Sequence, residues 1–355
     1  VYGVASALGT AHNNIVLTKS FTYTFRTYFK VREYGRFDYA FYYDNVLDTT
    51  WWNVSEAKAN TKGARFEIME AYFADGGTDA DGNVVEGSSK QITFGGQNTK
   101  VVDSGEEFTS DDVSINIPDG HFLAFTWSIK VSANKGGSVP FTESTFATCY
   151  KKQGVCASQE NADGFATGNA MFGDQVLIAP NKILYQHSVE KNLVFIGDSI
   201  TQGVSTRKDL YEMWVAKVAD GLPNSYSVWN LGSGWATAGN LASDGAWLKK
   251  AATADEVFVC VGVNDLGGNI TLVEYQKLIK TIIDALRAKN PDILITLFTV
   301  PPFNYSGSQG NTWFAMNDWI RSRNIEGVDR YFDFAAVLSQ DAPNENYLKN
   351  KYMSS

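Results

Sequence analysis

The pattern of apolar residues changes at Asn192, and this change constrains the fold more than any other feature of the chain. Before Asn192, stretches rich in aromatic and β-branched residues are separated by clusters of Gly, Asp and Asn. After it, short apolar runs alternate with segments whose apolar residues recur at helical spacing. The first pattern is typical of antiparallel β-structure, and the second of a parallel sheet with crossover helices. A chain of 355 residues also favours two domains. We therefore expect a β-sandwich over residues 1–185 and an α/β domain over residues 190–355.

Several stretches of the first region have the composition of strands. They are Thr18–Val31, Phe37–Tyr43, Ala64–Phe73, Ser89–Phe94, Val113–Ile117 and Phe122–Val131. Turn-forming clusters such as Asp75-Gly-Gly lie between them, so the spacing predicts an antiparallel sandwich of the jelly-roll type. The segment Ala179–Glu190, which contains Pro180, is the expected junction.

The second region alternates expected strands with expected helices. The strands are Leu193–Ile196, Tyr226–Leu231, Glu256–Val261, Ile293–Val300 and Val328–Phe334, and the helices are Lys208–Leu222, Gly239–Lys250, Thr271–Lys289 and Thr312–Arg323. The third helix is the clearest, because Thr271 is a capping residue and Glu274 follows three positions later. Strands alternating with helices predict a parallel, three-layer, flavodoxin-like sheet.

Charge and composition exclude several classes of partner. The net charge of −9 argues against nucleic acid and anionic membrane surfaces, since both attract basic proteins. No apolar run approaches the roughly 20 residues of a membrane-spanning helix, so we expect no membrane insertion. Val1–Thr10 lacks the basic segment of a signal peptide, and the N-terminus therefore identifies no compartment.

The cysteines and histidines give no metal pattern. Cys149 and Cys156 bracket a short polar stretch, and their spacing fits either a disulfide or two free thiols on adjacent strands. Cys260 lies in an apolar run and is expected to be a small buried hydrophobe. Because no Cys/His cluster has ligand spacing, we expect neither a metal nor another cofactor.

Unusual polar residues follow three of the expected parallel strands. The segments are Gly197-Asp198-Ser199, Asn230-Leu-Gly-Ser-Gly-Trp-Ala-Thr237 and Gly262-Val-Asn264-Asp265. Taken singly, each is also compatible with a helix cap or a tight turn. Together they place a serine, backbone amides next to glycines and a side-chain amide at one edge of the sheet. Acyl transfer needs this combination of a nucleophile with donors aimed at a developing oxyanion.

These three segments, in this order and spacing, resemble the SGNH (GDSL) hydrolases. The resemblance covers about Asn192 to Phe334. It implies that Ser199 is the nucleophile and that the Ser199 N–H, a loop glycine N–H and the Asn264 side chain form the oxyanion hole. Gly234 is preferred to Gly232 as the glycine donor. Asp198, Trp235 and Asp265 lie in the same segments and are expected to contact the substrate.

The family's fourth segment, Asp-x-x-His, supplies the general base, and this chain has no histidine after His187. His12 and His121 lie in the expected β-domain, and His187 precedes the first parallel strand. Truncation before the fourth segment is the favoured explanation. A pseudoenzyme, or a histidine from the β-domain or a second subunit, is the alternative. The chain as printed is then expected to be nearly inactive. Asp333 is expected to cap a loop.

The resulting hypothesis is a serine esterase that removes small acyl groups, acetyl above all, from a carbohydrate. An aromatic-rich β-domain ahead of the hydrolase segments motivates the carbohydrate, because aromatic faces suit sugar rings. The tryptophans considered for such contacts are Trp51, Trp52, Trp127 and Trp235, with core packing favoured for Trp127. The alternatives are a lipid-directed esterase of the lysophospholipase kind and a non-catalytic glycan-binding protein. The β-domain is also compatible with a purely structural role.

Overall fold

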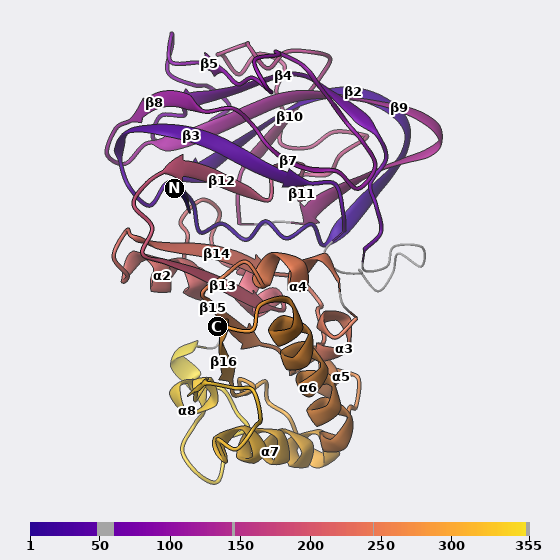
Figure 1. Cartoon of the computed structure of the whole chain (residues 1–355), viewed down its shortest axis with the longest axis vertical. Helices are drawn as coiled ribbons and strands as arrows, with labels where there is room; N and C mark the ends of the chain where they lie inside the picture. The colour runs from indigo at the N-terminus through magenta and orange to yellow at the C-terminus, as the bar shows by residue number, and fades with distance from the viewer. Residues whose placement is uncertain (48–59, 144–145, 244, 353–355) are drawn as a thin grey trace.

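The computed structural model describes residues 1–47, 60–143, 146–243 and 245–352. Figure 1 shows two layered regions stacked along the long axis, with antiparallel strands above and a helix-flanked sheet below. The first contains strands β1 to β12, and the second begins at β13. Trp51 and Trp52, considered above as sugar contacts, lie outside the described residues.

The first region consists of antiparallel sheets. One has five strands, ordered β1 (Tyr2–Val4), β12 (Lys182–Gln186), β3 (Gly35–Asp44) and β7 (Glu107–Thr109), with β8 (Val113–Ile117) also paired to β3. The other has seven, ordered β10 (Cys149–Gln153), β2 (Asn14–Lys30), β9 (Phe122–Glu143), β4 (Phe66–Asp75) and β5 (Lys90–Gln91), with β11 (Val176–Leu177) on β9 and β6 (Lys100–Val102) on β4. Every pairing among them is antiparallel.

Aromatic side chains fill the space between these sheets. Phe41 of β3 packs against Phe125 and Trp127 of β9, with ring centroids 5.0 Å and 5.9 Å away. All three are fully buried, because alternate residues of a strand point to the same face. The sandwich expected from the sequence is confirmed, and Trp127 is a core residue. The jelly-roll connection stays a prediction.

One expected boundary differs from the structure. The segment expected to be the junction, Ala179–Glu190, contains strand β12, which pairs with β1 on one side and β3 on the other. Pro180 precedes this strand and therefore removes no hydrogen bond from the ladder.

The second region is a five-stranded parallel sheet. Its strands are β13 (Lys191–Gly197), β14 (Tyr226–Gly232), β15 (Glu256–Cys260), β16 (Leu294–Phe298) and β17 (Arg330–Phe332), ordered β14-β13-β15-β16-β17. With β13 counted as the first strand, this order is 2-1-3-4-5, the flavodoxin-like order. The parallel α/β fold expected from the sequence is confirmed. Such sheets place ligands at the carboxyl ends of the strands, where the order reverses.

Helices flank this sheet on its two faces. They are α1 (Ser199–Gln202), α2 (Trp214–Asp220), α3 (Ala238–Leu241), α4 (Ala246–Ala251), α5 (Val263–Gly267), α6 (Leu272–Lys289), α7 (Gly307–Arg321) and α8 (Phe334–Leu338), with a short 3₁₀ turn at Asn350–Tyr352. Within β13, Phe195 shares a core cluster with Val215 of α2, whereas Ile196 shares one with Ile282 of α6. The alternating side chains of one strand thus contact both helical layers.

The helix expectations are met unevenly. Helix α6 agrees with its prediction, because Thr271 and Glu274 form the expected reciprocal capping box. The helix predicted over Lys208–Leu222 is wrong in its first part, since Asp209 and Tyr211 have positive φ angles of 61° and 52° and α2 begins only at Trp214.

Two further helices differ in extent. The predicted helix Gly239–Lys250 is divided into α3 and α4. Helix α7 begins at Gly307, before the predicted start at Thr312. No helix within the described ranges has the length and apolarity needed to cross a bilayer.

The two regions pack directly against each other. The Val4 N–H donates to Ser227 Oγ at 3.0 Å, joining β1 to β14. The indole N–H of Trp229 donates to the Asn181 carbonyl at 3.2 Å, and Arg32 Nη2 donates to the Ala219 carbonyl at 2.8 Å. These contacts hold the sandwich over the end of the sheet that carries β14 and β13 (Figure 1).

Candidate active site

Ser199 sits at the turn between strand β13 and helix α1. The strand ends at Gly197, Asp198 is the N-cap, and Ser199 is the first helical residue. Gly197 is required by close packing, because a Cβ there would collide with the Cys260 carbonyl and with Thr201 Oγ1. No described residue hydrogen-bonds to the Ser199 hydroxyl. At the first position of a helix, its backbone N–H is also left over by the helical ladder.

Asp198 faces the protein interior. Its Oδ1 accepts a hydrogen bond from the Ile200 N–H at 2.9 Å, and the residue is only 2% exposed. Burial, with a smaller contribution from the charge of Asp265, raises the pKa of Asp198 to about 7. Asp198 therefore acts as the helix cap and is not among the residues that line the cavity described below.

The loop after β14 approaches α1 closely. Asn230 Nδ2 donates to the Thr201 carbonyl at 3.0 Å, and Asn230 Oδ1 accepts from the Gly232 N–H at 2.9 Å. A Cβ on Gly232 would collide with the backbone of Thr201 and Gln202. The Gly232 N–H is thus already bonded, whereas Gly234 borders the cavity.

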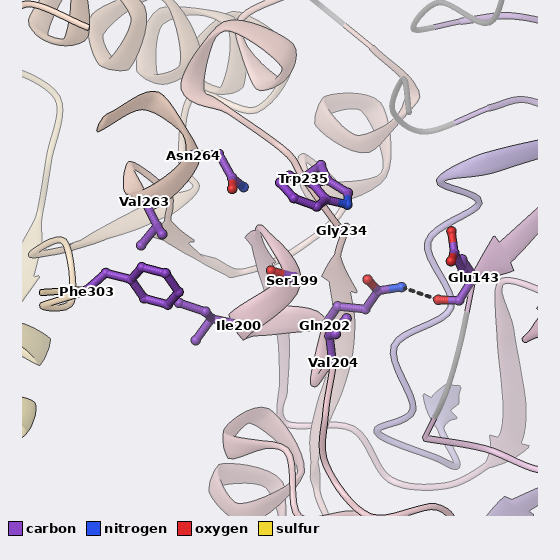
Figure 2. A pocket seen from close by; sticks show the side chains of 10 residues that line it. All are labelled: Glu143, Ser199, Ile200, Gln202, Val204, Gly234, Trp235, Val263, Asn264 and Phe303. Atoms are coloured by element: carbon purple, nitrogen blue, oxygen red, sulfur yellow. Dashed lines mark hydrogen bonds between the residues drawn. The ribbon is translucent and has the colours of Figure 1, made fainter. Parts of the chain in front are cut away.

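Trp235 follows Gly234 in a left-handed conformation. Its φ is 64°, which is strained for a bulky residue. Its side chain is 52% exposed, and it borders the cavity beside Gly234 (Figure 2). Strain of this kind is retained where the surrounding structure holds a side chain in a required position.

Helix α5, after β15, carries Asn264 and Asp265. Its N-cap, Gly262, has a φ of 141°, and a Cβ there would collide with Val300. Asn264 Nδ2 donates to the Ala236 carbonyl at 2.9 Å, which fixes the amide plane and leaves one N–H of the amide. Asp265 accepts from the Ala238 N–H at 3.0 Å with both carboxylate oxygens.

Asp265 resembles Asp198 in its environment. It is 5% exposed, and burial raises its pKa to about 6. Its carboxylate joins α5 to the start of α3 and does not line the cavity. Both acidic residues that were expected to contact the substrate therefore hydrogen-bond to backbone amides within the site.

The three strand ends converge on one cavity of about 260 Å³. Figure 2 shows Ser199 with Asn264 and Trp235 on one side and Ile200 and Phe303 on another. The complete lining is Glu143, Ser199, Ile200, Gln202, Val204, Gly234, Trp235, Val263, Asn264 and Phe303. A second hollow of about 590 Å³ shares Trp235, Val263, Asn264 and Phe303 with it. The site therefore continues past Asn264 towards α7.

Residues 195–352 match the family model described as GDSL-like lipase/acylhydrolase. The C-terminal domain belongs to this family. The resemblance drawn from the three strand-end segments is thereby confirmed. No curated protein sequence matches the chain significantly.

Solved structures also resemble part of the chain. A protein assigned to the lipolytic G-D-S-L family from Desulfitobacterium hafniense DCB-2 is 27% identical, with 46% of this chain and 86% of that one covered and a TM-score of 0.37. A GDSL-like lipase from Bacteroides thetaiotaomicron VPI-5482 is 17% identical over 46% and 78%, with a TM-score of 0.35. AlinE4, an SGNH-hydrolase family esterase, is 18% identical over 44% and 83%, with a TM-score of 0.35.

None of the three histidines lines the cavity of the GDSL domain. His12 is buried in the sandwich between the carbonyls of Asp44 and Ala179, and burial, with the nearby charge of Lys250, lowers its pKa to about 4. His121 and His187 instead lie beside carboxylates of the sandwich. His121 Nδ1 lies 2.7 Å from Asp75 Oδ1, and His187 Nε2 lies 2.8 Å from Glu33 Oε2.

Other candidate groups have structural roles. Asp333 caps α8 by accepting from the Ala336 N–H at 3.0 Å and also pairs with Arg321 at 2.8 Å, as a capping residue should. Cys149, Cys156 and Cys260 are free thiols. Among the described residues, no group of three or more His, Cys, Asp or Glu side chains could hold a metal ion.

The structure adds lining residues that the sequence did not indicate. Phe303 follows the Pro-Pro pair after β16 and is 62% exposed at the cavity. Its position after a parallel strand is a signal that could have been used. Glu143 comes from the end of β9 in the sandwich and carries no such local signal.

Proposed function

We propose that this protein is a serine esterase that removes small acyl groups, acetyl above all, from a carbohydrate. The observation that carries the proposal is the convergence of Ser199, Gly234 and Asn264, from three strand ends, on one cavity of a GDSL-like domain. A hydroxyl to which no described residue hydrogen-bonds, next to backbone and side-chain N–H groups, suits attack on an ester carbonyl.

In the proposed reaction, Ser199 Oγ forms a bond to the ester carbonyl carbon while its proton passes to a base. The carbonyl oxygen becomes an oxyanion, which the N–H groups of Ser199 and Gly234 and the remaining Asn264 amide N–H stabilise. Collapse breaks the bond to the alcohol oxygen, which leaves with a proton. Water then attacks the acyl-serine by the same route and releases the carboxylic acid.

The reaction also needs a general base, and no histidine lines the cavity. In the family that the strand-end segments resemble, a histidine of an Asp-x-x-His segment fills this role. We therefore expect the residues described here to give slow hydrolysis that added imidazole accelerates, because a small base can enter an open site and accept the Ser199 proton.

The decisive experiment measures p-nitrophenyl acetate hydrolysis by the full chain and by Ser199→Ala, each with and without imidazole. The variant also corrects for hydrolysis by imidazole itself. We expect an imidazole-dependent enzymatic rate in the parent chain and none in Ser199→Ala, because only the parent has a hydroxyl that imidazole can deprotonate. Equal rates for the two proteins would contradict the assignment of Ser199. Glycan binding without turnover in the parent chain would favour the non-catalytic alternative.

The proposal of a carbohydrate substrate rests on two exposed aromatic side chains at the cavity. Trp235 is 52% and Phe303 is 62% exposed, and both also border the neighbouring hollow. Exposed rings at the rim of a cavity suit the apolar faces of sugar rings. Acetylated xylan fragments should therefore be better substrates than simple alkyl acetates, and Trp235→Ala should lower kcat/KM for the former more than for the latter.

A lipid-directed esterase is the second candidate, because five of the lining side chains are aliphatic or aromatic: Ile200, Val204, Trp235, Val263 and Phe303. A series of p-nitrophenyl esters from acetate to octanoate separates the two functions. Falling kcat/KM with chain length supports the small-acyl assignment, whereas rising kcat/KM supports the lipid-directed one.

A further inference from the structure

The wall of the cavity opposite Phe303 belongs to the sandwich. Glu143 is the last residue of β9, and it lines the cavity together with Ser199 and Gln202. Figure 2 shows it on a ribbon separate from the GDSL domain, with Phe303 at the far side of the cavity. A residue distant in sequence from all three strand-end segments, and one with an acidic side chain, therefore lines the site.

The backbone of Glu143 is fixed on several sides. Its N–H donates to Asn13 Oδ1 at 3.0 Å, and its carbonyl accepts from Gln202 Nε2 at 3.2 Å. It also pairs with Val176 in the β9–β11 ladder. The bond from Gln202 is important, because Gln202 is the last residue of α1, the helix that Ser199 begins. This hydrogen bond therefore ties the backbone of Glu143 to the helix that carries Ser199.

The side chain of Glu143 is partly withdrawn from water. Burial raises the pKa of its carboxyl group, while a hydrogen bond from the Asn14 side chain acts in the opposite direction. A desolvated carboxylate with lone pairs to spare accepts further hydrogen bonds readily. Glu143 is the acidic side chain among the residues that line this cavity.

A second acceptor lies beside it. Gln202 is fully buried, and no described residue donates to its Oε1. A buried acceptor without a donor is costly to the fold, and because Gln202 lines the cavity, a donor that enters the cavity can relieve this cost. Glu143 and Gln202 together present acceptors, and the chemistry that satisfies acceptors is a hydroxyl group.

We propose that Glu143 of the sandwich recognises the hydroxyl groups of the alcohol part of the substrate, so that the sandwich supplies specificity to the GDSL domain. This inference rests on the proposed esterase function. A polyhydroxylated alcohol fits, because its hydroxyls can donate to Glu143 while its apolar face lies on Trp235. A quaternary ammonium group fits less well, since it is bound by several aromatic faces around one point. Of the two aromatic side chains labelled in Figure 2, Trp235 lies on the side of the cavity nearer to Glu143 and Phe303 lies at the far side.

Binding to a chain that cannot turn over separates this inference from catalysis. The background is Ser199→Ala, and the ligand is a mono-acetylated methyl xyloside measured by calorimetry. We expect Glu143→Ala to raise Kd about tenfold or more, since a charge-assisted hydrogen bond contributes roughly that factor. Glu143→Gln keeps the shape and one acceptor oxygen, and should raise Kd less.

Glu67→Gln is the matched control. Glu67 lies on β4 of the same sheet, is half-exposed, faces Lys130 and does not line the cavity. This control should bind like the parent. Unchanged melting temperatures of the two Glu143 variants would show that the fold is intact.

Two results would overturn the proposal: Kd within twofold of the parent for both Glu143 variants, or tighter binding of acetylcholine than of the xyloside. The second result would assign Glu143 to a cation. Failure of the esterase proposal is a different result, namely no Ser199-dependent hydrolysis, and it would leave a Glu143-dependent xyloside affinity in place.

Discussion

The site has two walls of different origin. One wall is the carboxyl edge of the parallel sheet, where Ser199, Gly234 and Asn264 each lie a few residues beyond a strand. The other is the end of β9, where Glu143 is placed by pairing with distant strands. The first wall is encoded locally by strand, turn and helix signals. The second depends on tertiary packing, so it can change with the sandwich while the sheet edge stays the same.

The two regions are expected to differ most in how the ionisation of one aspartate in each changes stability with pH. Burial raises the pKa of Asp198 in the GDSL domain to about 7, whereas hydrogen bonds from Asn83 lower the pKa of Asp81 in the sandwich. For Asp198, the protonated carboxyl is favoured in the fold, so its stabilisation is complete below about pH 4 and is lost as pH rises towards 7. For Asp81, the sign is reversed, and its contribution is lost as pH falls.

Asp198→Asn should therefore remove a destabilising charge above neutral pH while keeping an oxygen to cap Ile200. We expect a gain in unfolding free energy of up to about 4 kcal/mol at pH 8 and little change at pH 4. Urea unfolding of both proteins at a series of pH values is the measurement. Asp81→Asn should lose stability instead, by a small amount because Asp81 is near the surface. A gain that does not depend on pH would contradict the burial argument.

Asn264→Ala tests whether the wall at the sheet edge stabilises the oxyanion. Loss of a side-chain donor to an oxyanion should lower kcat by about 10²-fold, or about 3 kcal/mol of transition-state stabilisation. KM should change little, because the donor acts on the charge that develops during attack. Steady-state kinetics with p-nitrophenyl acetate, with imidazole present, provide both constants. A rise in KM with constant kcat would instead assign Asn264 to ground-state binding.

Gly232→Ala tests whether the wall at the sheet edge needs the close packing of the loop after β14 against α1. Its Cβ would collide with the backbone of Gln202, so we expect a loss of about 2 kcal/mol or more in stability and a displaced α1. Gly173→Ala, in the sandwich, is the control, because a Cβ there meets no atom of the described residues within 4 Å. Chemical denaturation of the two variants compares them directly. Equal stability would show that α1 yields to the added methyl group.

Thr271→Ala gives the smallest effect and tests a residue that lines neither the cavity nor the neighbouring hollow. The variant loses the capping box at the start of α6, in which the Thr271 side chain accepts from the Glu274 N–H. We expect a loss of about 1 kcal/mol in stability with unchanged kcat/KM. Thermal unfolding and the esterase assay measure the two quantities separately, and a large fall in activity would show that α6 positions the site.

The sequence predicted those parts of the molecule that depend on near neighbours. The capping box of α6 and the apolar runs of β13 to β16 are local, and both were found. The same is true of the strand-end segments, because parallel strands must bring their carboxyl ends to one edge. The preference for Gly234 over Gly232 as an oxyanion donor, in contrast, needs the structure, because only the structure shows that the Gly232 N–H already donates to Asn230.

The remaining features depend on long-range contacts. Asp209 interrupts the predicted helix because its carboxylate accepts hydrogen bonds from Thr148, a residue of the sandwich. Strand β12 lies in the expected junction because β1 and β3 bind it from both sides. Glu143 enters the cavity for the same kind of reason. In each case the deciding partner lies far away along the chain, where periodicity and turn signals carry no information.

The shared core between the two regions has a consequence for ancestry. Phe195 and Met213 of the GDSL domain belong to one buried cluster with Phe29 and Val31 of the sandwich. If either region were replaced by an unrelated domain, the apolar surface of the remaining region would become exposed to solvent. Recombination at the junction would therefore have two costs, namely the loss of buried apolar area and the loss of the cavity wall that Glu143 forms. We expect such a pair to be inherited and to diverge as a unit, with substitutions on one side matched by substitutions on the other.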